Sequence, residues 1–527
     1  MAALREQLAR SKRGFVRRLS SPSPLARTLI LVALGFGLPL QAALPALAEV
    51  AGQEDALPVL KGTSAGASAV NAATPVSPIN YARPKKRKPL LPKALGRPNA
   101  RPLPALQAYP TAPVYRRRGT LDPQAAPGPT VAAIPVLPAP KRHAEEANPF
   151  DPIGFDVGSL RLKPYIELDT GYDSNPNQQA TSVRGSLFGR TEGGVTAQSN
   201  WSVHELDASL KAGYSDYFKA RDASRPDASA IVNGRLDATR DLAFDAQGRF
   251  ALGSQRAGSA GVLQNVTLGQ RPLTYAYGGS LGATQKINRL TLLLRGSVDR
   301  SNNDNATDVA GNIINLALQD YNSYALRGRA SYEVTPGISP FVDATVDKRV
   351  YDARLDGSGF DRNSNGFAAK AGSSFELSRI LTGELSAGYA RRDYADTRLK
   401  PLSGPTIDAA LVWTASPLTT VTLAGTTALN ETTVTNSSGA LTRGVTLTVA
   451  HALFRNFTLT GVASYQLADY QGSSQRETTW GTSLKADYNL TRSVMVRSSF
   501  THQRLQSTVP GSDYTANTVM LGLRFQP

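Results

Sequence analysis

Residues 160–169 read LRLKPYIELD, and this stretch decides the fold. Leucine, proline or isoleucine stands at every even position, whereas the odd positions carry Arg161, Lys163, Tyr165, Glu167 and Asp169. Side chains alternate between the two faces of a β-strand, so the stretch predicts one apolar and one polar face. The proline at 164 fits a strand near an edge, because proline cannot donate a hydrogen bond to a ladder.

The same alternation recurs as far as Phe525, for example over 290–299, 324–333 and 457–467. The apolar-polar stretches are roughly twice as long as the five or six residues typical of strands in soluble sandwiches. Their connections alternate between very short and long. Both rhythms are typical of a closed antiparallel β-barrel in an outer membrane, with short periplasmic turns and long external loops. We therefore predict an all-β, up-and-down transmembrane barrel.

The connections give the strand count. Eight short turns are expected at 201–202, 240–241, 287–288, 336–337, 378–379, 416–417, 455–456 and 491–492. Nine long loops are expected at 173–187, 217–228, 253–271, 301–319, 352–364, 394–405, 430–440, 469–477 and 505–514. Together they join about 18 strands, and 16 stays open because the boundaries near 180–200 and 260–275 are weakly marked. An even number places both ends of the barrel in the periplasm.

The chain has 527 residues, no cysteine and a net charge of +17. Without cysteine there is no disulfide framework and no thiolate zinc site. The charge is uneven, because residues 1–160 hold 21 Lys and Arg against 9 Asp and Glu. The basic character therefore belongs mostly to the N-terminal third.

The N-terminus resembles an export signal. Seven basic residues precede the uncharged stretch 28–48, which ends in Ala46-Leu47-Ala48, a small-x-small cleavage pattern. An uncleaved membrane anchor is the alternative, although Pro39 and Pro45 weaken a continuous helix. We predict a signal peptide over 1–48, a disordered Pro/Ala-rich periplasmic arm over 49–157, and the barrel over 158–527. The basic arm serves either as a spacer or as a contact for anionic partners such as peptidoglycan.

Charged residues on the polar faces of the strands are the candidate functional residues. An 18-stranded barrel is wide enough to hold water, and cations on its wall would favour polar, and in particular anionic, solutes. Alternatively, these charges pair across strands and hold the barrel in shape. The candidates that line the lumen are Arg295, Arg327, Arg329, Glu333, Asp343, Asp347, Arg349, Glu384, Arg392, Arg497 and Arg524.

No residue pattern points to catalysis. His204, His451 and His502 fall in apolar register, where they cannot form a lumenal acid-base pair, and no histidines have metal-ligand spacing. We therefore predict no enzyme, cofactor or metal. Loop 301–319, with the apolar residues Ile313, Ile314, Leu316 and Leu318, is the best candidate for a constriction in the lumen.

The stretch 165–176, YIELDTGYDSNP, resembles the opening strand of the putative β-barrel porin 2 family of Gram-negative outer membranes. The resemblance covers the barrel and not the arm, and it implies an outer-membrane channel without catalytic residues. The last strand alternates Val519, Leu521, Leu523 and Phe525, which resembles the signal read by the barrel assembly machinery, although Gln526 and Pro527 follow the final aromatic residue.

Three functions are compatible with this sequence. The first is a porin-like channel for polar solutes, and the second is the outer-membrane component of an exopolysaccharide exporter, whose periplasmic proteins the arm would contact. The third is a structural or adhesive barrel with a closed lumen. Outer-membrane lipid and lipopolysaccharide are expected partners of each, and nucleic acid is not.

Overall fold

The computed structural model describes residues 150–255, 268–308, 311–378, 380–432 and 437–527, all within one compact unit. The predicted signal peptide, with Ala46 and Ala48, and the predicted arm up to residue 149 lie outside these residues. The end of the predicted arm is described, and Phe155–Val157 forms a short strand, β1, paired with the start of the next strand. No helix among the described residues is long and apolar enough to cross a membrane.

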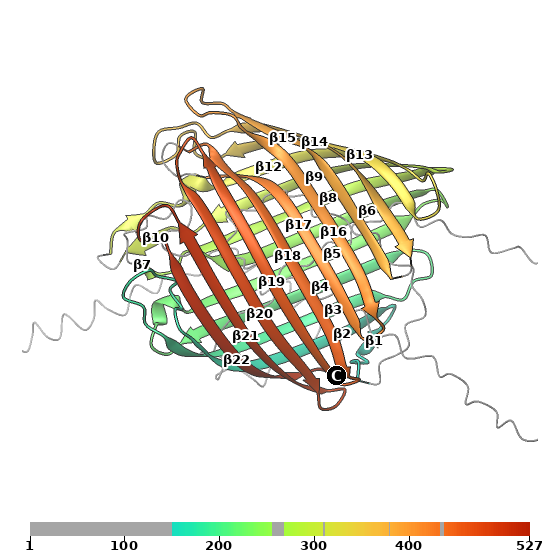
Figure 1. Cartoon of the computed structure of the whole chain (residues 1–527), viewed down its shortest axis with the longest axis horizontal. Helices are drawn as coiled ribbons and strands as arrows, with labels where there is room; N and C mark the ends of the chain where they lie inside the picture. The colour runs from blue at the N-terminus through green and yellow to red at the C-terminus, as the bar shows by residue number, and fades with distance from the viewer. Residues whose placement is uncertain (1–149, 256–267, 309–310, 379, 433–436) are drawn as a thin grey trace, which may run out of the picture. The chain divides into compact units, whose positions relative to one another are not determined.

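Eighteen long antiparallel strands form a closed barrel, which confirms the predicted fold and the higher strand count (Figure 1). The ring closes where the first long strand pairs with the last, from Ile166 opposite Phe525 to Asp173 opposite Thr518. The strands are β2 (Leu160–Asp173), β3 (Ser186–Ser199), β4 (Glu205–Tyr217), β5 (Arg225–Asp237), β6 (Leu242–Ser254), β8 (Leu273–Ile287), β9 (Leu290–Asn303), β12 (Tyr321–Tyr332), β13 (Ile338–Tyr351), β14 (Ser364–Ser378), β15 (Leu381–Tyr394), β16 (Leu402–Ser416), β17 (Thr419–Glu431), β18 (Gly439–Phe454), β19 (Phe457–Gln471), β20 (Arg476–Asn489), β21 (Val494–Ser507) and β22 (Tyr514–Phe525).

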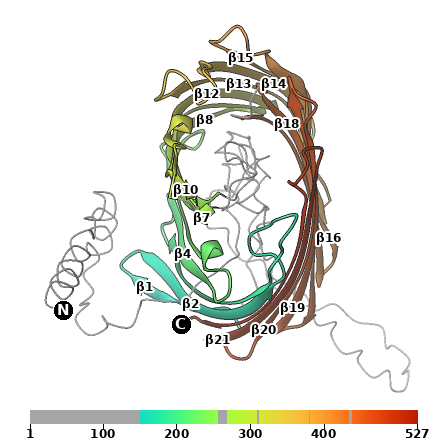
Figure 2. The ribbon, with the colours of Figure 1, turned by 90° about the vertical axis from the view of Figure 1, so that its left-hand side faces the viewer.

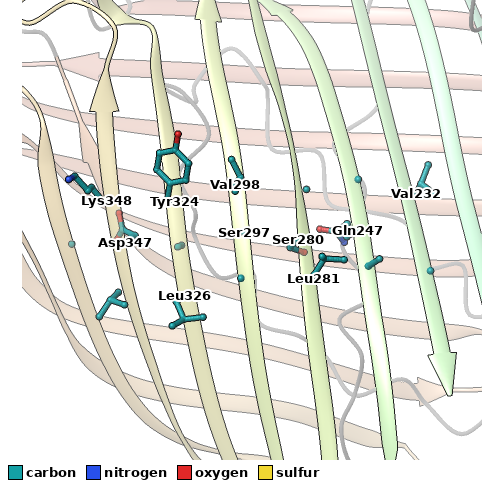
Figure 3. A pocket seen from close by; sticks show the side chains of 18 of the residues that line it. Val232, Gln247, Ser280, Leu281, Ser297, Val298, Tyr324, Leu326, Asp347 and Lys348 are labelled. Atoms are coloured by element: carbon teal, nitrogen blue, oxygen red, sulfur yellow. The ribbon is translucent and has the colours of Figure 1, made fainter. Parts of the chain in front are cut away.

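The alternation of the sequence becomes an outward and an inward face. In β2, Ile166 and Leu168 are about half exposed, whereas Glu167 and Asp169 are 3% and 6% exposed. Figure 3 shows the same pattern across β8, β9 and β12, where Leu281, Val298 and Leu326 belong to the outward set. The apolar face therefore points away from the ring axis and the polar face towards it, as membrane barrels require.

Five aromatic side chains are exposed on the outward face: Tyr172, Tyr214, Tyr389, Trp413 and Trp480. Each ring has an apolar body and a polar edge, which suits the boundary between lipid and water.

The eight predicted short turns all lie at junctions between consecutive strands, and three of them begin on the last residue of a strand: Ile287, Ser378 and Ser416. Residue 379, in the turn between β14 and β15, lies outside the described part of the chain. Several long loops carry small elements of their own. They are η1 (Arg221–Ala223), β7 (Leu268–Gln270), β10 (Ala306–Asp308), β11 (Ile313–Ile314) and η2 (Ala317–Gln319), of which β11, β10 and β7 form a three-stranded sheet.

Candidate functional site

The inward face of the barrel wall is charged, and ten of the eleven predicted lumen-lining residues lie on it. They are Arg295 in β9, Arg327 and Arg329 in β12, Asp343, Asp347 and Arg349 in β13, Glu384 and Arg392 in β15, Arg497 in β21 and Arg524 in β22. The exception is Glu333, which follows the end of β12 and belongs to the short turn before β13; its backbone N–H donates to the carbonyl of Arg289. The turn begins one residue earlier than the alternation indicated.

Two arginines of β12 bind carboxylates on other strands. Arg329 donates from Nη1 and Nη2 to both carboxylate oxygens of Glu384, at 2.9 and 2.8 Å. Its guanidinium also lies 3.6 Å from the ring centroid of Phe341. Arg327 forms an ion pair with Asp343. Bidentate and stacked arginines hold a fixed geometry, so these contacts brace β12, β13 and β15 from the inside.

A second set of ion pairs joins strands that are not neighbours. Arg295 of β9 lies 2.5 Å from Asp245 of β6, and Arg249 of β6 lies 2.5 Å from Asp299 of β9. These two reciprocal bridges cross over β8, which separates β6 from β9. Lys370 of β14 likewise pairs with Asp408 of β16 across β15.

The line where the barrel closes has its own charged cluster. Arg497 donates from Nη1 to both oxygens of Glu167, at 2.8 and 2.9 Å, and from Nε to Asp487 at 2.9 Å. Arg524 lies 3.6 Å from the same Glu167 and 3.5 Å from the ring centroid of Tyr165. The cluster links β2, the first long strand, to β20, β21 and β22.

A third cluster is centred on Glu431, at the end of β17. This buried carboxylate accepts hydrogen bonds from the hydroxyl of Tyr351 at 2.8 Å and that of Ser364 at 2.6 Å. Arg392 and Arg349 lie 3.1 and 3.5 Å from it. The four partners belong to the inward faces or ends of β13, β14 and β15, none of which neighbours β17 in the sheet. The end of β17 has therefore separated from β16 and turned towards the ring interior, while it stays paired with β18.

These contacts give all seven predicted arginines a carboxylate within 4.0 Å. The partners that the sequence analysis did not name as candidates are Asp245, Asp487, Glu167 and Glu431. Alternation could have identified the first three, which stand at inward positions of their strands. It could not have identified Glu431, because β17 continued straight would turn this residue to the lipid side.

Loop 174–185 lies inside the ring of strands, in teal in Figure 2. Asn175 donates to the carbonyl of Thr515 at 3.1 Å, and Gln178 donates to Gln503, on the inward face of β21, at 3.3 Å. Gln178 and Ser182 have φ values of 53° and 57°, a region in which residues with a side chain are uncommon. Such backbone is kept where surrounding contacts over-determine it, as at ligand clamps and switches.

The predicted constriction loop, 301–319, contains β10, β11 and η2 and makes contacts within itself. Leu316 is buried and its backbone N–H donates to Asn305 at 3.0 Å, whereas Ile313 is 74% exposed. Its role as a constriction stays a prediction. Loop 174–185 and the end of β17 are further candidates, because both are bonded to inward-facing groups.

A groove of about 1210 Å³ runs along the wall over β4, β5, β6, β8, β9, β12, β13 and β14 (Figure 3). Its exposed lining side chains, such as Leu281, Val298 and Leu326, belong to the outward apolar face. Gly248, Gly279 and Gly296 have no side chains, so the outer surface is hollowed at these positions. The groove therefore faces lipid and is no part of the lumen.

Two histidines of the wall point away from the lumen. His451 and His502 lie on the outward face, where His451 contacts Thr419 at 2.9 Å and His502 contacts Asn517 at 2.7 Å. Within the described ranges, no group of His, Asp or Glu has the geometry to hold a metal ion.

Comparison with known proteins gives one family. The family model described as putative beta-barrel porin 2 matches residues 148–527, and no curated protein matches the chain. Among solved structures, the copper transporter OprC has a TM-score of 0.40 at 11% identity, covering 72% of this chain and 84% of its own. Pseudomonas aeruginosa OccK2 (OpdF) has a TM-score of 0.37 at 12% identity, and the match covers 69% of this chain and 98% of OccK2. The siderophore receptor PiuA from Acinetobacter baumannii has a TM-score of 0.38 at 9% identity, and the match covers 71% of this chain and 82% of PiuA. These likenesses are too weak to carry an argument about solutes.

Proposed function

Because the chain belongs to the putative β-barrel porin 2 family, we propose that it is an outer-membrane channel that passes polar solutes along the barrel axis. The observation that carries the proposal is the inward face, which is lined by charged and hydroxyl side chains on strand after strand. An apolar solute would gain nothing from such a wall, whereas a hydrated one can exchange hydrogen bonds with it.

The pairing of the wall charges bears on the kind of solute. A ring of unpaired cations would attract anions, but each predicted arginine lies beside a carboxylate, and such a pair acts as a short dipole with little field at a distance. We therefore propose that uncharged and zwitterionic polar solutes pass at least as readily as anions.

The test is conductance of the purified full chain in planar bilayers, with the reversal potential measured across a potassium chloride gradient. We expect discrete conductance steps and weak preference between potassium and chloride. A barrel that stays closed in every salt would contradict the channel and favour a structural or adhesive barrel. A strong chloride preference in the unaltered protein would contradict the role given to the pairing.

One pair of variants tests the pairing directly. Glu384→Gln removes the carboxylate that Arg329 binds at 2.8 Å, so the freed guanidinium should shift the reversal potential towards chloride. Asp393→Asn is the matched control, because it removes the acid of an ion pair with Arg391 on the outward face, where both side chains are half exposed. This control should leave the reversal potential unchanged.

A further inference from the structure

The ladder between β16 and β17 is incomplete. It runs from the short-turn end only to Ala409, opposite Gly425, and it does not include residues 402–408 and 426–431. On the far sides of the same two strands, β15 pairs with β16 from Leu402 onwards and β17 pairs with β18 as far as Glu431. We call this unladdered stretch between β16 and β17, in the long-loop half of the barrel, the seam.

Side chains take the place of the missing backbone bonds. Thr427 Oγ1 accepts from the N–H of Ile407 at 3.1 Å and donates to the Ile407 carbonyl at 3.0 Å. Four residues earlier on β16, the side-chain amide of Gln471 does the same for Ser403. It accepts from the Ser403 N–H at 3.3 Å and donates to the Ser403 carbonyl at 2.7 Å. Between them stands Pro405, which has no N–H to satisfy. The β16 edge of the seam thus has partners for its N–H groups without a ladder.

Apolar side chains fill the seam. Leu441 of β18 packs against Gly404 of β16, where an added Cβ would lie 2.8 Å from its Cδ2 atom. Leu402 and Leu441 are 0% and 5% exposed. Ile407 and Val445 are about half exposed or more on the outward face nearby. Leu402 and Leu441 therefore close the seam with buried apolar side chains beside the apolar outward face.

A polar recess lies on the inner side of the seam. It has a volume of about 100 Å³, and its lining includes Thr406 and Asp408 of β16, Thr427 of β17 and the inward residues Arg349 and Arg392. Its carboxylates are engaged, since Lys370 and the Thr427 N–H both bind Asp408. Three buried donors of the lining have no hydrogen-bond partner among the described residues, Thr406 Oγ1, Arg349 Nε and Arg392 Nε, of which Arg392 Nε lies 3.1 Å from the Glu431 carboxylate. The recess can thus offer hydrogen bonds to an acceptor without disturbing its own ion pairs.

We propose that the seam and the recess form one binding site for a single-chain amphiphile. Its acceptor-bearing head lies in the recess against Thr406 and Arg349, and its acyl chain passes through the seam into the outer leaflet. A zwitterionic head suits the recess, because the cations and carboxylates of its inward lining balance. This goes beyond passage of polar solutes along the axis, because the ligand enters or leaves through the wall.

The test is photolabelling of the full chain in lipid nanodiscs, with dodecylphosphocholine carrying a diazirine in its chain as the probe. We expect labels concentrated in 402–408 and 439–445 and competed by unlabelled dodecylphosphocholine. Labels spread evenly over the outward faces of all strands, without competition, would overturn the proposal, because they report only lipid contact.

Variants separate binding in the recess from general lipid contact. Thr406→Val removes the partnerless hydroxyl at nearly constant shape and should lower seam labelling about fivefold, the effect of one ordinary hydrogen bond. Thr414→Val is the matched control, on the inward face of the same strand but outside the recess, and should label like the unaltered chain. Equal labelling of all three proteins would overturn the assignment of the head to the recess.

A second measurement guards against misfolding and separates this proposal from the channel. Potassium chloride conductance is measured on the same preparations, and Thr406→Val should keep it. Normal conductance without seam labelling overturns the amphiphile site alone, whereas seam labelling without conductance overturns the channel alone.

Discussion

The barrel has two lines of contact that invite comparison, the closure between β2 and β22 and the seam between β16 and β17. The closure joins residues more than 300 positions apart, yet its ladder runs unbroken over eight residue pairs. The seam lies within one hairpin, yet its ladder stops halfway. Separation along the chain therefore does not decide which line of the wall is loose.

Local chemistry accounts for the difference. Each line has a glycine that leaves space for a side chain from another strand. At the closure, an added Cβ on Gly522 would meet Asp169, whereas at the seam one on Gly404 would meet Leu441. The closure is backed by ion pairs on its inner side, whereas the seam contains a proline and an apolar filling. The closure should therefore stay paired, whereas separation of β16 from β17 at the seam should need less free energy.

The largest expected effect concerns the closure. Arg497→Ala leaves Glu167 and Asp487 buried without their shared cation, which should cost about 3–5 kcal/mol of unfolding free energy. The measurement is heat- or denaturant-induced unfolding followed by gel mobility. Arg391→Ala, which breaks an exposed outward pair, should cost roughly 0–1 kcal/mol. Equal losses in the two variants would refute the role given to the buried cluster.

A change at Glu431 should act on the lumen as well as on stability. Glu431→Gln weakens the anchor between the end of β17 and the three strands β13, β14 and β15, so this end should move away from the inner wall. We expect a larger or noisier single-channel conductance. Glu167→Gln is the control at the closure. It also weakens a buried cluster, but this cluster holds no chain segment inside the ring, so the conductance of the variant should not change. If the conductance of Glu431→Gln is unaltered, the end of β17 does not narrow the lumen.

A smaller, local effect is expected at the seam itself. Thr427→Val leaves the N–H and carbonyl of Ile407 without their partner, at a cost of about 1–3 kcal/mol confined to that stretch. Amide hydrogen exchange should become faster at Ile407 and stay slow at Leu411, whose N–H faces the same side of β16 and which lies in the intact ladder opposite Leu423. Thr419→Val, on the same strand within the laddered part, is the control. Uniform protection along β16 in both variants would mean that the seam is as firm as its neighbours.

The smallest effect concerns the loop that leads into the seam. Hydrogen bonds from Arg398 hold the pKa of Asp396 well below its usual value of 3.8. A depressed pKa means that the charged pair contributes stability above the unfolded pKa and loses it only as the pH falls through the lower folded value. Protease resistance of 395–401 should thus be equal at pH 7 and at about pH 4, whereas Asp396→Asn should be cleaved faster at both. Loss of resistance in the unaltered chain near pH 4 would contradict this.

The sequence predicted the closed barrel, the 18 strands and the inward position of ten candidates, because period and connection length depend only on neighbouring residues. It could not predict which carboxylate each arginine binds, since Arg295 reaches across β8 to Asp245 and Arg497 reaches β2. It also could not place Glu431, because the alternation of β17 does not show that its ladder with β16 ends at Gly425. Loop 301–319 was chosen by its apolar content, whereas loop 174–185 is polar and enters the ring through hydrogen bonds.

The closure between β2 and β22 also affects the order in which the barrel assembles. Apart from it, the barrel strands pair with their predecessors along the chain, so each such pairing closes a short loop, whereas Ile166 must meet Phe525 across nearly the whole barrel. The entropic cost of loop closure grows only with the logarithm of length, but nothing offsets it until the final ladder forms. We expect assembly to proceed hairpin by hairpin to an open, curved sheet, and the last strand to convert that sheet into a ring in a single slow step.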